Sequence, residues 1–183
     1  MKAGKTVRTF TAKDGRKVTL RTIRWEDLDD LLELINSLVT ERANIIRDTP
    51  VSREEEIEWL SKALALQEKG EVIYVVAVVD GKVVANSEIR RRLSGYDKHT
   101  AIIGVAIKEG FRDLGLGTEI MKTLIQLGRE MKLKVLMLTA FANNTRAIHV
   151  YQKLGFKETG RIPQKFFKDG NYIDEVLMTC MLE

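Results

Sequence analysis

Cysteine, histidine and proline are all scarce in this sequence of 183 residues. Cys180 is the single cysteine, so no disulfide can form within the chain and no cysteine-based metal site is expected. Because His99 and His149 are the only two histidines, a zinc centre is not expected either. The sequence therefore predicts no bound metal, and any catalysis has to come from ordinary polar side chains.

Long apolar runs are also missing, since none approaches the roughly 18–20 residues that span a bilayer. The segment from Met1 to Arg8 lacks the apolar stretch of a secretory signal. We therefore expect a cytoplasmic protein without a membrane partner. Hydrophobic residues make up 44% of the sequence and charged residues 31%, which is typical of a folded globular chain. The length predicts that residues 1–183 form a single domain.

The formal net charge of +4 favours acidic partners, which include phosphorylated cofactors and nucleic acids. The basic run Arg90–Arg92 ends a predicted strand, where charged residues commonly protect a sheet edge. Aromatic and basic residues do not interleave anywhere in the chain, so a nucleic-acid-binding domain is the least favoured interpretation. No nucleic-acid partner is expected.

Strand patterns and helix patterns alternate along the chain, and this predicts an α/β fold. Turn signals such as Asp14-Gly15 and Asp80-Gly81 separate paired strands, and Gly70 ends a helix. Strands are expected at residues 7–11, 18–24, 72–79, 82–92, 100–107 and 134–141 and on both sides of the turn at 168–171, with helices at 25–39, 52–70, 118–131 and 145–154.

A turn with two glycines joins the strand ending at Ile107 to the helix that follows it. The turn contains Arg112-Asp113-Leu114-Gly115-Leu116-Gly117 and is followed by Thr118. Glycines allow the backbone to approach a ligand closely, and the N–H groups at a helix N-terminus attract anions. Such turns also serve only to pack a strand against a helix, so this motif alone does not establish a phosphate site.

A second motif follows about thirty residues later, in the helix that begins after Asn144. Asn144 is followed by Ala147 and Tyr151, and Gly155-Phe156 closes the helix. With the first motif, this spacing resembles the GNAT superfamily of acetyltransferases. The cofactor loop of that family reads Arg/Gln-x-x-Gly-x-Gly/Ala, and its later helix reads Asn-x-x-Ala-x-x-x-Tyr-x-x-x-Gly-Phe. The C-terminal part is similar to the branch with phosphinothricin, polyamine and ribosomal-protein N-terminal acetyltransferases.

The resemblance implies an α/β fold of the GNAT type, with a mixed, mostly antiparallel central sheet of about seven strands flanked by helices. It also implies acetyl-CoA as the cosubstrate. Backbone groups of the strand end would pair with the pantetheine arm, and the glycine turn would hold the pyrophosphate. The implied cofactor-binding residues are Val105, Ala106, Ile107, Arg112, Asp113, Leu114, Gly115, Leu116, Gly117, Thr118, Asn144 and Lys153.

Transfer to an amine needs an acid for the departing thiolate and a base for the amine. By the resemblance, Tyr151 is the expected acid. For the base, some relatives carry a glutamate on the strand before the cofactor loop, but residues 101–105 contain no carboxylate. Glu88 on the preceding strand, His99 or a chain of waters could take this role. The alternative for Glu88 is a salt bridge with Arg90 or Arg92.

The resemblance implies an enzyme that transfers an acetyl group from acetyl-CoA directly to a primary amine. The acceptor would be a small molecule, a protein N-terminus or a lysine. Residues 25–70 and the turn at 168–170 are expected to shape the acceptor pocket. A non-catalytic acyl-CoA-binding sensor with the same fold is the main alternative. A homodimer would form if a C-terminal strand edge paired with its copy.

Overall fold

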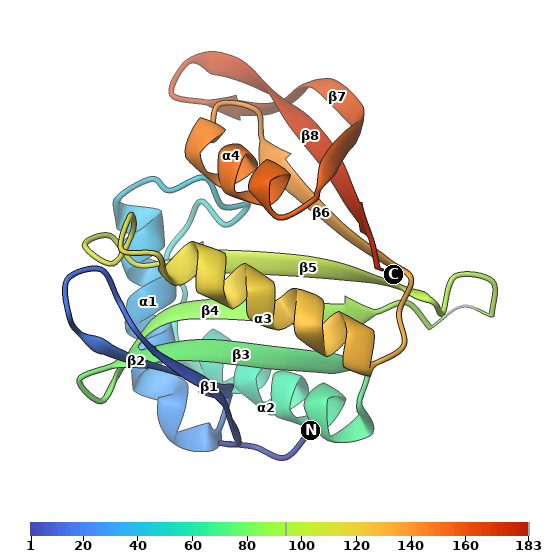
Figure 1. Cartoon of the computed structure of the whole chain (residues 1–183). Helices are drawn as coiled ribbons and strands as arrows, with labels where there is room; N and C mark the ends of the chain where they lie inside the picture. The colour runs from blue at the N-terminus through green and yellow to red at the C-terminus, as the bar shows by residue number, and fades with distance from the viewer. Residues whose placement is uncertain (94, 183) are drawn as a thin grey trace.

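The computed structural model describes residues 1–93 and 95–182. One sheet forms its centre, with strand order β1-β2-β3-β4-β5-β6-β8-β7 (Figure 1). The strands are β1 (Thr6–Thr11), β2 (Lys17–Thr22), β3 (Val72–Val79), β4 (Lys82–Arg91), β5 (Thr100–Ile107), β6 (Val135–Phe141), β7 (Lys157–Lys168) and β8 (Asn171–Met181). The helices are α1 (Leu28–Thr40), α2 (Arg53–Lys69), α3 (Leu116–Glu130) and α4 (Thr145–Lys153), with a 3-10 turn at Trp25–Asp27.

The sheet has eight strands, where the resemblance implied about seven. The residue patterns alone had indicated eight strand segments, among them the edge strand β1, which is largely exposed but pairs with β2 from Thr6 to Thr11. Backbone hydrogen bonds to β2 extend the sheet through β1, even though few of its side chains reach the core. The other expected features of the fold, a mixed and mostly antiparallel sheet flanked by helices, are confirmed.

The sheet splits between its two parallel strands, β5 and β6. Their pairing covers only three positions, from Thr100 opposite Val135 to Ile102 opposite Met137. On its other side, β5 stays paired with β4 as far as Ile107. The last five residues of β5 therefore have a strand neighbour on one side only, and no strand pairs with their backbone groups on the β6 side.

Helices cover both faces of the sheet (Figure 1). The first apolar cluster lies under α3, where Ile120, Met121 and Leu124 are almost fully buried. The second lies under α1 and α2, where Leu34 and Leu60 are buried against β3. The sheet therefore has an apolar core on each face. The sheet separates these two cores, and the split between β5 and β6 is a gap in it. No helix in the described part of the chain is long and apolar enough to cross a membrane.

A buried ion pair fixes the entry to α1. The carboxylate of Asp27, 2% exposed, accepts two hydrogen bonds from the guanidinium of Arg21 on β2, at 2.5 and 2.7 Å. It also accepts a hydrogen bond from the backbone N–H of Arg24 at 3.0 Å. A paired guanidinium and carboxylate satisfy each other inside the protein, whereas either group alone would be a buried, uncompensated charge.

We expect Asp27→Ala to lower the free energy of unfolding by about 3–5 kcal/mol, because it leaves the Arg21 guanidinium buried without a partner. Chemical denaturation measures this loss. Glu58→Ala is the matched control, since its ion pair with Lys62 is solvent-exposed and contributes at most about 1 kcal/mol. Equal losses in the two variants would contradict the role assigned to the buried pair.

Candidate active site

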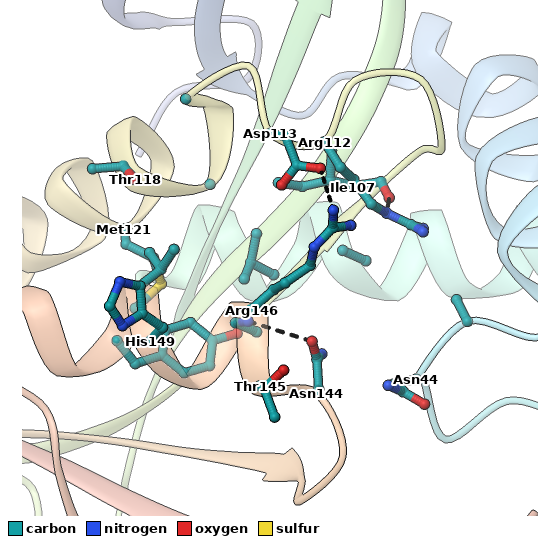
Figure 2. Close-up of a pocket in the computed structure, with 18 of the residues that line it drawn as sticks. Asn44, Ile107, Arg112, Asp113, Thr118, Met121, Asn144, Thr145, Arg146 and His149 are labelled. Atoms are coloured by element: carbon teal, nitrogen blue, oxygen red, sulfur yellow. Dashed lines mark hydrogen bonds and ion pairs between the residues drawn. The ribbon is translucent and has the colours of Figure 1, made fainter.

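A cavity of about 620 Å³ occupies the split in the sheet (Figure 2). Its walls are the end of β5, the start of α3, most of α4 and the loop after α1. Of the residues predicted from the sequence to bind the cofactor or act in catalysis, the structure brings eleven together here: Val105, Ala106, Ile107, Arg112, Asp113, Gly115, Gly117, Thr118, Asn144, Tyr151 and Lys153.

The glycine turn forms the end of the cavity nearest to α3. Gly115 is the N-cap of this helix at φ 91°, and Asp113 lies at φ 63°. Left-handed residues that alternate with a right-handed or extended one ahead of a helix direct backbone N–H groups into one concavity, where the positive end of the helix dipole favours an anion. Gly117 lies so close to β5 that a Cβ there would be 3.4 Å from Ile107 Cδ1. The local geometry therefore suits a phosphate group.

Two of the predicted cofactor residues, Leu114 and Leu116, do not line the cavity. Leu116 is 1% exposed, and both leucines pack against the core under α3. Only their backbone atoms are in a position to serve a ligand. The carbonyl of Leu114 accepts a hydrogen bond at 3.1 Å from the N–H of Lys13, which belongs to the β1–β2 turn. Lys13 itself lines the cavity, and no local motif in the sequence predicted this contact.

The opposite wall is α4. Asn144 caps this helix by accepting a hydrogen bond from the N–H of Ala147 at 3.4 Å, and its amide lines the cavity (Figure 2). Tyr151 also lines the cavity and is only 8% exposed. Burial raises the pKa of Tyr151 to about 12, so the phenol is protonated throughout the physiological range. It is a hydrogen-bond and proton donor that faces the split in the sheet.

Charged side chains surround the cavity, but they are not equally available to a ligand. Arg146 crosses from α4 to form an ion pair with Asp113 at 3.0 Å (Figure 2). Arg112 donates from Nε to the carbonyl of Ile107 at 2.9 Å and also pairs with Glu41. Lys153 is exposed and has no ion-pair partner among the described residues. Arg146 has no place in the two motifs and was missed by the sequence analysis.

The loop between α1 and α2 closes the rim of the cavity and is held by the turn between β7 and β8. The ammonium of Lys168 donates to the carbonyls of Arg42 and Ala43, at 2.6 and 3.1 Å, and to Asn44 Oδ1 at 2.8 Å. Ala43, Asn44 and Ile45 line the cavity. We call this contact between Lys168 and residues 42–44 the loop clasp.

The candidate bases lie outside this cavity. Glu88 on β4 is opposite Gly104 and forms an ion pair with Arg90 at 2.8 Å, and Arg90 also donates to the hydroxyl of Tyr74 at 2.8 Å. His99 directly precedes β5, at the end where β5 is still paired with β6. At about 3.3 Å per residue, the six residues from His99 to Val105 separate this imidazole from the lining of the cavity by roughly 20 Å.

A second cavity, of about 540 Å³, lies on the sheet face covered by α1 and α2. Leu38 and Ala106 line both cavities, so the two spaces meet at the end of β5. Glu56 lines the second cavity and is 6% exposed. Burial raises the pKa of this carboxyl above its usual range. The sequence analysis did not single out Glu56.

An open strand edge beside an anion-binding turn is the geometry of a protein that holds an extended, phosphorylated ligand. The chain belongs to the acetyltransferase (GNAT) family, whose model matches residues 29–156. Within the described residues, no group of three or more His, Cys, Asp or Glu side chains is placed to hold a metal ion.

The relatives of the chain carry the names of N-acetyltransferases. An L-methionine sulfoximine/L-methionine sulfone acetyltransferase from Pseudomonas paraeruginosa is 26% identical over 159 residues, covering 86% of this chain and 90% of the relative. An N-alpha-acetyltransferase from Sulfurisphaera tokodaii is 27% identical over 180 residues, covering 93% and 97%. A phosphinothricin acetyltransferase from Sinorhizobium meliloti, solved with acetyl-CoA, has a TM-score of 0.80 at 21% identity, covering 90% and 88%.

Glu56 is expected to make stability depend on pH. Because its pKa is raised in the folded state, that state binds more protons than the unfolded chain between the two pKa values. Its contribution to stability is therefore greatest below the unfolded pKa of about 4.5 and falls as the pH rises through the folded pKa. Glu56→Gln should stabilise the protein more at pH 7 than at pH 4. Thermal unfolding at both pH values measures the difference, and an equal change at both would contradict the assignment.

Proposed function

We propose that this chain transfers the acetyl group of acetyl-CoA directly to a primary amine. The observation that carries the proposal is the open backbone edge at Val105–Ile107, which lies in one cavity with the glycine turn and Tyr151. The pantetheine arm would add to β5 as a strand, and the pyrophosphate would rest on the N–H groups of residues 113–118. Asn144 and Lys153 would contact the ligand from the α4 side.

The reaction needs no covalent intermediate on the protein. The residues that line the cavity include no cysteine or serine, and Cys180 is buried on β8, where burial raises the pKa of its thiol. The neutral amine would attack the thioester carbon, and the C–S bond would break with the electron pair leaving on sulfur. Tyr151 would then give its proton to the CoA thiolate.

Membership of the acetyltransferase family, together with the similar structure from Sinorhizobium meliloti that was solved with acetyl-CoA, supports catalysis. It disfavours the alternative of a non-catalytic acyl-CoA-binding sensor. We propose that residues 1–183 act as one acetyltransferase domain. A homodimer also remains a proposal. Its support is that β7 is an edge strand and that Phe167 and Tyr172, at the tip of the β7–β8 hairpin, are 68% and 66% exposed.

Tyr151→Phe should lower kcat by about 100-fold and leave the affinity for acetyl-CoA nearly unchanged, because only the proton donor is removed. Release of free CoA thiol measures turnover, and calorimetric titration measures binding. Tyr172→Phe is the matched control, since that phenol is exposed on β8. Full turnover in Tyr151→Phe would exclude the acid role, and binding without turnover in the unaltered protein would favour the sensor.

We propose Glu88 as the group that receives the amine proton, through water. Its carboxylate lies on the same face of β4 as Asn86, which lines the second cavity. The opposing residue, Gly104, has no side chain to cover this carboxylate. A Cβ at that position would lie 3.8 Å from Glu88 Oε1. Its ion pair with Arg90 supports the alternative of a purely structural role.

The two roles of Glu88 predict different losses of activity. Loss of a base in Glu88→Gln should lower kcat/KM by about 100-fold. Arg90→Gln breaks the same ion pair but keeps the carboxylate, so its loss should be much smaller. If both variants show the same small loss of kcat/KM, Glu88 acts only through the ion pair.

A further inference from the structure

The second cavity is placed to hold the molecule that receives the acetyl group. Ala106 lines both cavities, so the second cavity adjoins the first at this residue. Ala106 lies between Val105 and Ile107, the two β5 residues whose backbone faces the split. Asn86 on β4 is directly opposite Ala106 in the strand register and lines only the second cavity. A molecule in the second cavity therefore reaches the end of β5 from the α1 and α2 side, while a ligand on the open edge reaches it from the other.

Glu56 gives this cavity an uncompensated negative charge. Its carboxylate has no hydrogen-bond or ion-pair partner within residues 1–93 and 95–182, although the residue is only 6% exposed and lines the cavity. The other acidic side chains of the cavity are paired: Glu55 with Arg47 at 3.0 Å, and Glu58 with Lys62 at 3.8 Å. An isolated buried carboxylate is costly in free energy, and a cation supplied by a ligand would relieve that cost.

Asn86 supplies a second acceptor without a partner. Its Oδ1 atom is sealed from solvent and accepts no hydrogen bond within the described part of the chain. A buried amide oxygen in that state is unfavourable, and rotation of the amide lets it serve a donor in the cavity. A primary ammonium carries three donors and no acceptor, which matches the two acceptors, Glu56 and Asn86.

The remaining wall restricts what the ammonium can carry. Leu31, Leu34, Ile35, Val51 and Trp59 make it largely apolar. The two cations of the cavity, Arg47 and Lys62, are those already paired with glutamates. The lining carries three carboxylates, on Glu55, Glu56 and Glu58, against these two cations, so its net charge is negative and disfavours a further carboxylate next to the ammonium.

We propose that the second cavity is the acceptor site and selects a primary ammonium with an apolar side chain and no adjacent carboxylate, with Glu56 as its counter-ion. This rests on the proposed acetyl transfer and narrows its substrate class. An amino-acid amide or the N-terminal residue of a peptide has this chemistry, whereas a free amino acid does not.

L-Leucinamide and L-leucine test the selection when they are compared at equal concentrations of the neutral amine, because the carboxylate of leucine also raises the pKa of its ammonium. With acetyl-CoA and the whole protein, CoA thiol release should give a kcat/KM at least about tenfold higher for leucinamide than for leucine, measured with a leucine-initiated peptide as the third acceptor. Higher turnover of leucinamide or of the peptide than of leucine supports the proposal, and the peptide arm separates small amines from protein N-termini. A preference for leucine would overturn it.

Glu56→Gln tests the counter-ion. It should lower kcat/KM for leucinamide by about 10- to 100-fold, the loss typical of a hydrogen bond to a charged group, and leave KM for acetyl-CoA unchanged. Glu54→Gln is the matched control, since Glu54 lies on the same helix but is exposed and lies outside both cavities. Equal activity in Glu56→Gln and Glu54→Gln would overturn the role of Glu56.

Calorimetric titration of leucinamide into the complex with CoA keeps this inference separate from acetyl transfer itself. If leucinamide binds to the unaltered protein but not to Glu56→Gln, the acceptor site is supported. If, in addition, no acceptor is acetylated, only the proposed reaction fails. Binding that survives in Glu56→Gln, or no binding to the unaltered protein, overturns the site.

Discussion

The short pairing between β5 and β6 is the constraint on which the rest of the molecule depends. A parallel pair that continued to Ile107 would satisfy the backbone of β5 and close the sheet. Because the pairing stops at Ile102, the backbone of β5 lacks a strand partner on one side beside the N-terminus of α3. The first cavity occupies the gap that this leaves in the sheet, and the second cavity adjoins it at Ala106.

Much of the fold could be predicted from the sequence, because its signals are local. The turn signal at Asp80-Gly81 and the helix stop at Gly70 both occur where the structure has them. The glycine turn and the Asn-capped helix also predicted most of the residues that line the first cavity. Each motif has a backbone geometry that depends mainly on its own residues. The edge strand β1 was also expected, at residues 7–11, and it forms although its pairing depends on backbone bonds with little burial.

The parts of the site that could not be predicted arise from contacts between distant segments. Lys13 and Asn44 reach the first cavity only after the β1–β2 turn and the α1–α2 loop have packed against it. Glu56 had a usable signal that was missed: it precedes Leu60 by four residues and therefore shares the buried face of α2. Glu56 also follows two glutamates, Glu54 and Glu55, that are exposed, so the residue type alone does not distinguish the buried one.

The loop clasp also bears on when the site can form during synthesis. Lys168 holds residues that were made more than 120 positions earlier, and β8, which follows it, inserts between β6 and β7. The N-terminal layer can collapse as it leaves the ribosome, but the rim of the cavity stays loose until the β7–β8 hairpin arrives. A nascent chain would thus gain its core well before it gains a site able to hold a ligand, and cofactor binding would report that folding has finished.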